Sequence, residues 1–250
     1  MYEDVNGVRT WFEVRGEGEP LVLLHGGFGD SRDFEPNLVR LADRFRVFLV
    51  DRRGHGRTPD VPGDVDADLL AGDVVGFLER VVGGPAHLVG YSAGGVVALG
   101  AAARRPDLVR RLVVLNSGFS ADGWLFLPEP DGRFPPAVVD RYAEVSPDGR
   151  DHFPVVVDKF ARAARAPEVV DLAAITCPVL VLGSDDDIVH LEHTVALYRG
   201  IADAQLAIVP GSSHLMLFER PDLCVELVAG FLTSTPTPLT PTPLMPVRRA

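Results

Sequence analysis

The chain has 250 residues, of which 46% are hydrophobic, so it can bury the core of one large α/β domain and is not disordered as a whole. Its 24 basic and 35 acidic residues give a net charge of −11 and are scattered along the sequence. This pattern lacks the concentrated positive field that attracts nucleic acid or an anionic membrane, and it argues against both as partners.

The first half of the chain alternates between strand-like and helix-like segments. Strands are predicted at 10–15, 21–24, 45–50, 88–90 and 109–115, and helices at 34–41, 65–82 and 93–105, with Asp33 as a possible N-cap. Continuous apolar runs such as 21–24 are typical of strands that are covered on both faces. The alternation indicates βαβ units and a mostly parallel sheet, in which ligands bind beyond the carboxyl ends of the strands.

A different pattern occupies residues 119–172, where prolines cluster and two helices are predicted, at about 137–145 and 153–166, without strands between them. Its aromatic residues give it an apolar inner face, so we expect a small helical lid over the sheet. The α/β pattern returns with strands at 178–182 and 205–209 and helices at 191–198 and 221–232. We therefore expect a core of residues 1–118 and 173–232, a lid at 119–172, and a disordered tail rich in Pro and Thr at 233–250.

Five motifs follow predicted strands in a fixed order: His25-Gly26-Gly27, Asp51-x-Arg53-Gly54-His55-Gly56-x-Thr58, Gly90-x-Ser92-x-Gly94, Gly183-x-x-Asp186 and Gly211-x-x-His214. In this order the sequence resembles the α/β-hydrolase superfamily over roughly residues 9–232. The resemblance implies a mostly parallel, eight-stranded sheet flanked by helices. It also implies a nucleophile elbow, in which the glycines allow a sharp strand-to-helix turn that presents Ser92 at the sheet edge.

The resemblance assigns the roles of a catalytic triad. Ser92 is the expected nucleophile, and His214 the base that takes its proton and later protonates the leaving group. Asp186 is the expected partner of His214, because it matches the superfamily's spacing from Gly183. Asp185 and Asp187 would then be solvated or cap the next helix.

The resemblance also points to an oxyanion hole and a substrate pocket. The expected oxyanion donors are the backbone N–H groups of Gly27 and Ala93. Candidate substrate-binding side chains are Phe28 beside these donors, Tyr91 before the nucleophile, and Trp124 and Phe126 of the lid, although aromatic side chains are packing residues at least as often.

No metal or cofactor is expected. Asp187, His190, Glu192 and His193 lack an evident three-ligand spacing, and the resemblance supplies a metal-free chemistry. His25 and His55 are expected to brace the motif loops by hydrogen bonds. The two cysteines, Cys177 and Cys224, lie far apart, so buried thiols are expected rather than a disulfide, and the acidic N-terminus does not resemble a signal peptide, so we expect a cytoplasmic protein. The sequence leaves open whether the protein is a monomer or a homodimer. We expect no transmembrane segment.

A serine at position 92 distinguishes the chain from dehalogenases and epoxide hydrolases of the superfamily, which use a carboxylate, and from dienelactone types, which use a cysteine. The leading hypothesis is a serine hydrolase for a small or medium apolar carboxylic ester or lactone. A carbon–carbon bond hydrolase and a cofactor-free perhydrolase (haloperoxidase) are alternatives on the same triad. A non-catalytic ligand-binding receptor with this fold is an alternative of another class.

Overall fold

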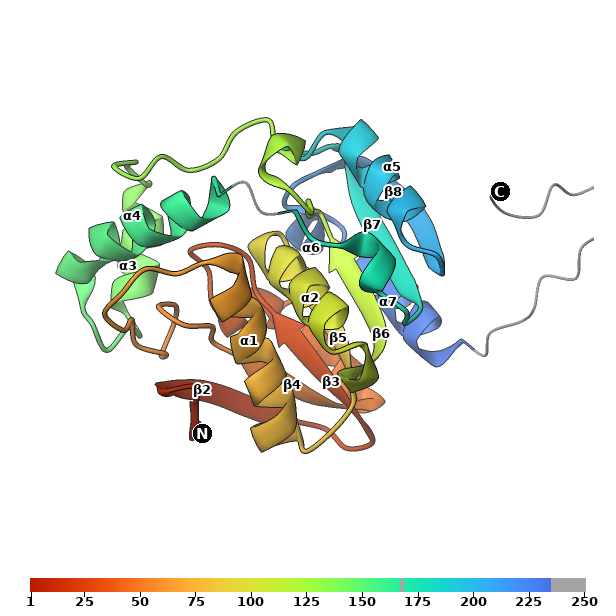
Figure 1. Ribbon diagram of the computed structural model, residues 1–250, viewed down its shortest axis with the longest axis horizontal. Helices are drawn as coiled ribbons and strands as arrows, with labels where there is room; N and C mark the ends of the chain where they lie inside the picture. The colour runs from red at the N-terminus through yellow and green to blue at the C-terminus, as the bar shows by residue number, and fades with distance from the viewer. Residues whose placement is uncertain (167–168, 235–250) are drawn as a thin grey trace, which may run out of the picture.

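A computed structural model describes residues 1–166 and 169–234. Its strands are β1 (Tyr2–Val5), β2 (Val8–Arg15), β3 (Glu19–Leu24), β4 (Phe45–Val50), β5 (Ala86–Tyr91), β6 (Val109–Leu115), β7 (Val179–Asp186) and β8 (Ala204–Ser213). Its α-helices are α1 (Ala67–Phe77), α2 (Ala93–Arg104), α3 (Pro136–Ala143), α4 (Phe153–Ala164), α5 (Leu191–Gly200), α6 (Met216–Glu219) and α7 (Pro221–Thr233). These elements form one sheet covered by helices (Figure 1).

The eight strands lie in the order β1-β2-β4-β3-β5-β6-β7-β8. The pairs β1–β2 and β2–β4 are antiparallel, and every other pair is parallel. The expected mostly parallel, eight-stranded α/β fold is therefore confirmed. The strand β1 was not predicted, because three of its four residues are exposed and polar or aromatic, and only its pairing with β2 reveals it.

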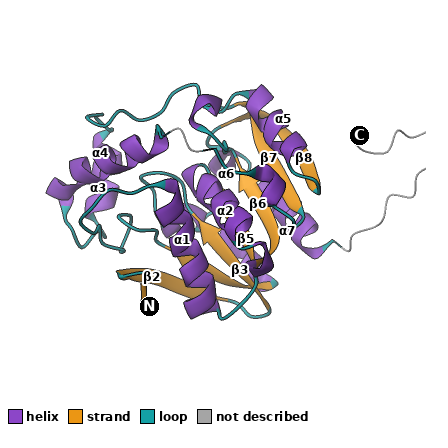
Figure 2. Ribbon diagram, viewed as in Figure 1, coloured by secondary structure: helices purple, strands orange, loops and turns teal. Residues whose placement is uncertain are grey.

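Helices cover both faces of the sheet, and the alternation of side chains along each strand separates two cores. One core packs α1, α2 and α5 against residues such as Val22 and Leu88, and the other packs α6 and α7 against residues such as Leu23 and Val89. Figure 2 shows α1 and α2 in front of the strands. Because both faces are covered, the central strands have the continuous apolar sequences from which they were predicted.

The helix predicted at 34–41 is wrong. Two short 3₁₀ helices, Ser31–Phe34 and Leu38–Asp43, occupy this region, and Asp30 and Asn37 cap them in place of Asp33. The buried Asn37 accepts a hydrogen bond from the N–H of Leu38 through its side chain, and this favours a cap over a helix interior.

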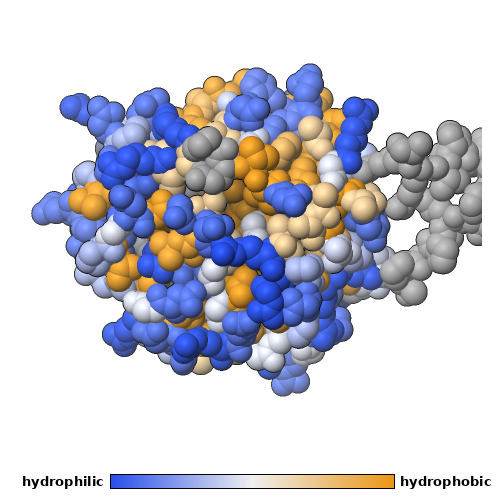
Figure 3. Space-filling view, viewed as in Figure 1, coloured by the Kyte–Doolittle hydropathy of each residue, from blue (hydrophilic) through white to orange (hydrophobic). Residues whose placement is uncertain are grey.

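The segment between β6 and β7 contains α3 and α4, whose aromatic residues pack together with Val65 of the core. Ion pairs join these helices to the core: Arg141 of α3 contacts Asp33 at 2.7 Å, and Lys159 of α4 contacts Asp60 at 2.7 Å. Figure 3 shows a mostly hydrophilic surface over α3 and α4, at the left, and hydrophobic residues gathered toward the upper middle. The inner side of the segment is therefore apolar and its outer side largely polar.

The last helix runs one residue into the segment that was predicted to be a disordered tail. Thr233 belongs to α7, and residues 235–250 of the predicted disordered tail lie outside the described residues. In the described part of the chain, no helix has both the length and the apolar character needed to cross a membrane.

Candidate active site

Ser92 lies at the sharp turn between β5 and α2, with φ 53° and ψ −124°. This backbone conformation is strained for a residue with a Cβ, and the chain closes tightly around it. A Cβ added to Gly90 would lie 2.5 Å from Gly94 O, and one added to Gly94 would lie 2.2 Å from Leu24 O. The two motif glycines are therefore required because backbone occupies the space of their side chains.

Ser92, His214 and Asp187 form a hydrogen-bonded chain at the carboxyl ends of the strands. His214, which follows β8, places Nε2 2.9 Å from Ser92 Oγ and Nδ1 2.6 Å from Asp187 Oδ1. The side chain of Asp187 is 3% exposed and that of His214 is 16% exposed. The carboxylate accepts the Nδ1 hydrogen, which leaves Nε2 free to accept the hydroxyl proton of Ser92.

The expected pairing of His214 with Asp186 is wrong, because Asp187 occupies that position. Strand β7 runs on to Asp186, and its register with β8 shifts between Ser184 and Asp186, so the residue that leaves the strand toward His214 is the next one. Asp186 is exposed. Asp185 accepts hydrogen bonds from the N–H groups of Gly211 and Ser212, so it holds the loop that precedes His214.

The glycine loop after β3 lies directly against the elbow. A Cβ added to Gly26 would be 3.4 Å from Ser92 Cβ, and one added to Gly27 would be 3.7 Å from Ala93 Cβ. Ala93 is the first residue of α2, and the first N–H groups of a helix have no partner within the helix. The structure thus brings Gly27 and Ala93, the two predicted oxyanion donors, close together beside Ser92.

The backbone of His214 is held by two side chains, one at the end of β5 and one directly after β6. Tyr91 donates its hydroxyl hydrogen to His214 O at 2.7 Å, and Asn116 Nδ2 lies 3.1 Å from the same oxygen. Tyr91 is 6% exposed, so the expectation that it binds substrate is corrected: it anchors the loop of His214. Asn116 has φ 44° and follows β6, and nothing in its local sequence distinguished it beforehand.

Aromatic side chains surround the predicted oxyanion loop. Phe28 has φ 58°, and the centre of its ring lies 4.6 Å from that of Phe134. The ring of Phe134 in turn lies 5.6 Å from the ring of Phe153. The ring of Trp124 lies 6.1 Å from that of His214. Phe126 is 63% exposed, and no described contact joins it to the triad. Phe28 and Trp124 therefore lie at the site, whereas Phe126 is at the surface.

The remaining predicted histidines have structural contacts. Burial lowers the pKa of His25 well below its usual range and that of His55 to about 3, so both are neutral, and each ring nitrogen Nδ1 contacts a loop carbonyl at 2.8 Å. His193 stacks on Phe119 and accepts its N–H at 3.1 Å. Across residues 1–166 and 169–234, no group of three or more His, Cys, Asp or Glu is arranged to hold a metal.

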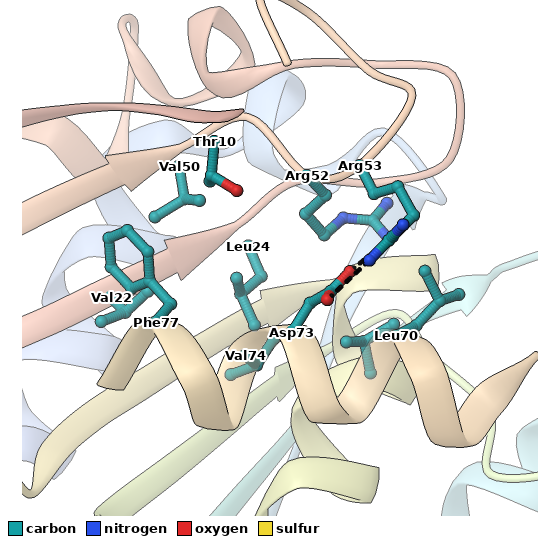
Figure 4. A pocket seen from close by; sticks show the side chains of 11 residues that line it. Thr10, Val22, Leu24, Val50, Arg52, Arg53, Leu70, Asp73, Val74 and Phe77 are labelled. Atoms are coloured by element: carbon teal, nitrogen blue, oxygen red, sulfur yellow. Dashed lines mark hydrogen bonds and ion pairs between the residues drawn. The ribbon is translucent and has the colours of Figure 1, made fainter. Parts of the chain in front are cut away.

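Two hollows lie away from Ser92. One, of about 30 Å³, lies between β3, β4 and α1 and is lined by Arg52, Arg53 and Asp73 together with apolar residues (Figure 4). It is too small for a substrate. The other, of about 870 Å³, is an open depression near His87, Arg110 and Ser234, at the end of the sheet opposite the elbow.

Comparison with known proteins supports the resemblance. The model of the alpha/beta hydrolase family matches residues 21–227. The 2-(acetamidomethylene)succinate hydrolase of Mesorhizobium japonicum is 26% identical over 261 residues, which are 92% of this chain and 93% of that protein. The putative carbamate hydrolase RutD of Agrobacterium fabrum is 30% identical over 253 residues, with 88% and 97% covered.

Solved structures share the fold. The enol-lactonase from Burkholderia xenovorans LB400 matches with a TM-score of 0.76 at 24% identity, over 94% of this chain and all of that one. A meta-cleavage product hydrolase from Pseudomonas fluorescens matches with a TM-score of 0.75 at 22% identity, over 91% and 95% of the two chains. Since the family model covers most of its length, the chain belongs to the α/β-hydrolase family and is a hydrolase.

Proposed function

We propose that this protein is a serine hydrolase that cleaves a small or medium apolar carboxylic ester or lactone through an acyl-enzyme. The hydrogen-bonded chain from Ser92 through His214 to Asp187 carries the proposal. Serine at its free pKa is a weak nucleophile, and a base at hydrogen-bond distance, itself oriented by a buried carboxylate, is the arrangement that activates it. The apolar rings of Phe28, Phe134 and Trp124 favour an apolar substrate.

In the first half of the proposed reaction, Ser92 Oγ attacks the carbonyl carbon of the ester while its proton passes to His214 Nε2. The carbonyl oxygen becomes an oxyanion, which accepts hydrogen bonds from the N–H groups of Gly27 and Ala93. Asp187 stabilises the imidazolium that has formed. When the tetrahedral intermediate collapses, the bond to the alcohol oxygen breaks, and His214 donates its proton to that oxygen.

In the second half, water takes the place of the alcohol. His214 Nε2 accepts a proton from water as the water oxygen attacks the acyl carbon, and the same N–H groups bind the second oxyanion. Collapse breaks the bond to Ser92 Oγ, which recovers its proton from His214, and the carboxylic acid leaves. A lactone follows the same steps, but its alcohol and acid remain one molecule.

Names of relatives and structural neighbours extend the range of acyl groups to be tested. They include hydrolases of an acetamidomethylene succinate and, putatively, of a carbamate, and a hydrolase of meta-cleavage products. The substrate panel should therefore contain an enamide, a carbamate and a vinylogous diketone besides esters and lactones. The cytoplasmic location stays a prediction.

The test compares the wild type with Ser92→Ala. We expect a fluorophosphonate to label the wild type alone, and Ser92→Ala to reduce turnover of short- and medium-chain aryl esters by about 10⁴-fold or more. Turnover of only the diketone would move the proposal to carbon–carbon cleavage. Ligand binding with neither labelling nor turnover would indicate a receptor and refute the enzyme mechanism.

A further inference from the structure

Arg52 is a buried cation at the back of the predicted oxyanion loop. Arg52 is 7% exposed, and its Nη2 donates a hydrogen bond to Gly26 O at 3.0 Å. No carboxylate in the described part of the chain lies within ion-pair distance of it, and its buried Nε has no hydrogen-bond partner there. Figure 4 shows the contrast with Arg53, whose guanidinium pairs with Asp73. An unpaired buried charge is costly, and such groups are concentrated where they serve a function.

The neutral His25 completes the contacts of the Gly26 carbonyl. The backbone N–H of Arg52 donates to His25 Nε2 at 3.0 Å, so the hydrogen of this imidazole is on Nδ1. That Nδ1 lies 2.8 Å from Gly26 O. The carbonyl oxygen of Gly26 therefore accepts one hydrogen bond from an imidazole and one from a guanidinium. Burial lowers the pKa of Arg52 to about 10, which leaves it protonated at neutral pH.

The carbonyl of Gly26 and the N–H of Gly27 belong to one peptide unit. In a trans peptide these two groups point in opposite directions, so a carbonyl turned toward Arg52 turns the N–H of Gly27 away from Arg52. Gly26 and Gly27 also lie against Ser92 and Ala93. A positive charge on the carbonyl end polarises the peptide and strengthens the hydrogen bond that its N–H donates.

We propose that Arg52 is a positioning residue for the oxyanion hole: it fixes the Gly26–Gly27 peptide and strengthens the N–H of Gly27 as a donor to the developing oxyanion. This inference rests on the proposed function. The hydrogen-bond lengths and the peptide between them put the guanidinium about 8 Å from the oxyanion. Two unit charges at that distance, with an effective dielectric near 20, correspond to about a thirtyfold change in rate. We expect a loss of about ten- to thirtyfold when the charge is removed, because solvent screens part of it.

The test compares Arg52→Met, which keeps the length of the aliphatic stem, with Arg52→Lys, which keeps a charge. Arg53→Met is the matched control, because Arg53 is the adjacent residue, is equally buried at 8%, and pairs with Asp73 without contacting Gly26. The readouts are kcat and KM for an aryl ester, the Ki of an arylboronic acid that forms a tetrahedral anionic adduct, the Kd of the uncharged product alcohol, and the melting temperature.

The expected result is a ten- to thirtyfold lower kcat for Arg52→Met, an equal rise in the Ki of the boronic acid, and an unchanged Kd for the alcohol. Arg52→Lys should recover most of both losses, and Arg53→Met should stay within about threefold of the wild type. A structural role alone would lower the melting temperature without this selective loss. If Arg52→Met does not fold, Arg52→Gln takes its place against Arg52→Lys.

Three results would overturn the inference: a kcat within about threefold of the wild type for Arg52→Met, an unchanged Ki beside a lower kcat, or an equal loss in Arg53→Met. Each of these leaves the proposed function intact, because labelling of the wild type that depends on Ser92 establishes that function separately. Absence of such labelling would overturn both.

Discussion

Replacing Asp187 by Asn should remove the charge of the triad without changing the tautomer of His214. Asp187 Oδ1 accepts hydrogen bonds from His214 Nδ1 at 2.6 Å and from the N–H of Ile188 at 2.7 Å. The N–H of Ile188 would hold the amide oxygen of Asn at the same position, so His214 still donates through Nδ1. What is lost is attraction to the imidazolium, about 4 kcal/mol for charges about 4 Å apart at an effective dielectric near 20.

We expect kcat to fall by about 10³-fold with little change in KM, because the imidazolium forms only after the ester has bound. The amide nitrogen would occupy the place of Asp187 Oδ2, which is buried without a hydrogen-bond partner among the described residues. An unsatisfied donor there costs about 1–3 kcal/mol of folding stability. The assay measures steady-state turnover of an aryl ester and the melting temperature of each variant.

Asp186→Asn and Asp185→Asn are the controls for this prediction. Asp186 is exposed, and its replacement should change kcat by less than about twofold. Asp185 holds the N–H groups of Gly211 and Ser212, so Asn in its place should mainly lower stability, and kcat by less than about tenfold. Equal losses at the three positions, or the largest loss at Asp186, would refute the assignment of Asp187.

Three further predictions concern the surroundings of the site. Burial raises the pKa of Asp33 to about 6, so the folded state binds its proton more tightly than the unfolded state does. The free energy of unfolding should therefore fall by about 3 kcal/mol as pH rises from about 4 to 6. Urea denaturation at several pH values measures this fall, which should be absent in Asp33→Asn. Lys159→Met leaves Asp60 with a side chain that is 6% exposed and has lost its ammonium partner. His152 Nε2 still contacts Asp60 at 3.0 Å, so this variant should be less stable by about 1–3 kcal/mol in calorimetry, and a smaller loss in the double variant with Asp60→Asn would identify the lost ammonium partner as the cause. Asn116→Asp replaces the amide that donates to His214 O by a carboxylate, which has no hydrogen to donate. We expect kcat to fall by about tenfold with KM nearly unchanged, and an unchanged kcat would show that Asn116 does not position His214.

Much of the fold was predictable because each central strand can be recognised from its own apolar sequence. Residues 21–24, before His25, are continuously apolar, and residues 88–90, before Ser92, carry no polar side chain. Such short apolar runs are typical of strands with both faces covered. Ser92 was predictable for a related reason: the glycines at positions 90 and 94 are required by backbone contacts within or beside the same turn. The turn before His214 carries a similar local signal, because Gly211 has φ 62°, a conformation that favours glycine. A motif whose cause lies in its own loop can be read from the sequence.

The acid of the triad was not predictable in this way. The sequence holds three consecutive aspartates, and the one that reaches His214 depends on where β7 ends and on the irregular pairing of β7 with β8. That pairing joins residues that are more than twenty positions apart. Asn116 was missed for a similar reason, because its partners at Ser213 and His214 come from another strand. Register between strands, not the composition of either strand, decides both positions.

The loops of the site are held in place largely by hydrogen bonds to their backbone carbonyl groups, and these bonds fix the positions of the reactive groups. His214 O accepts from Tyr91 and Asn116, and Gly26 O accepts from Arg52 and contacts His25. These donors come from the ends of neighbouring strands or from the loops that follow them, which are fixed by the two cores on either side of the sheet. A substitution at a donor would therefore shift reactive groups without touching the substrate. Losses in kcat should exceed losses in stability at these positions, and the reverse should hold at buried ion pairs such as that of Lys159.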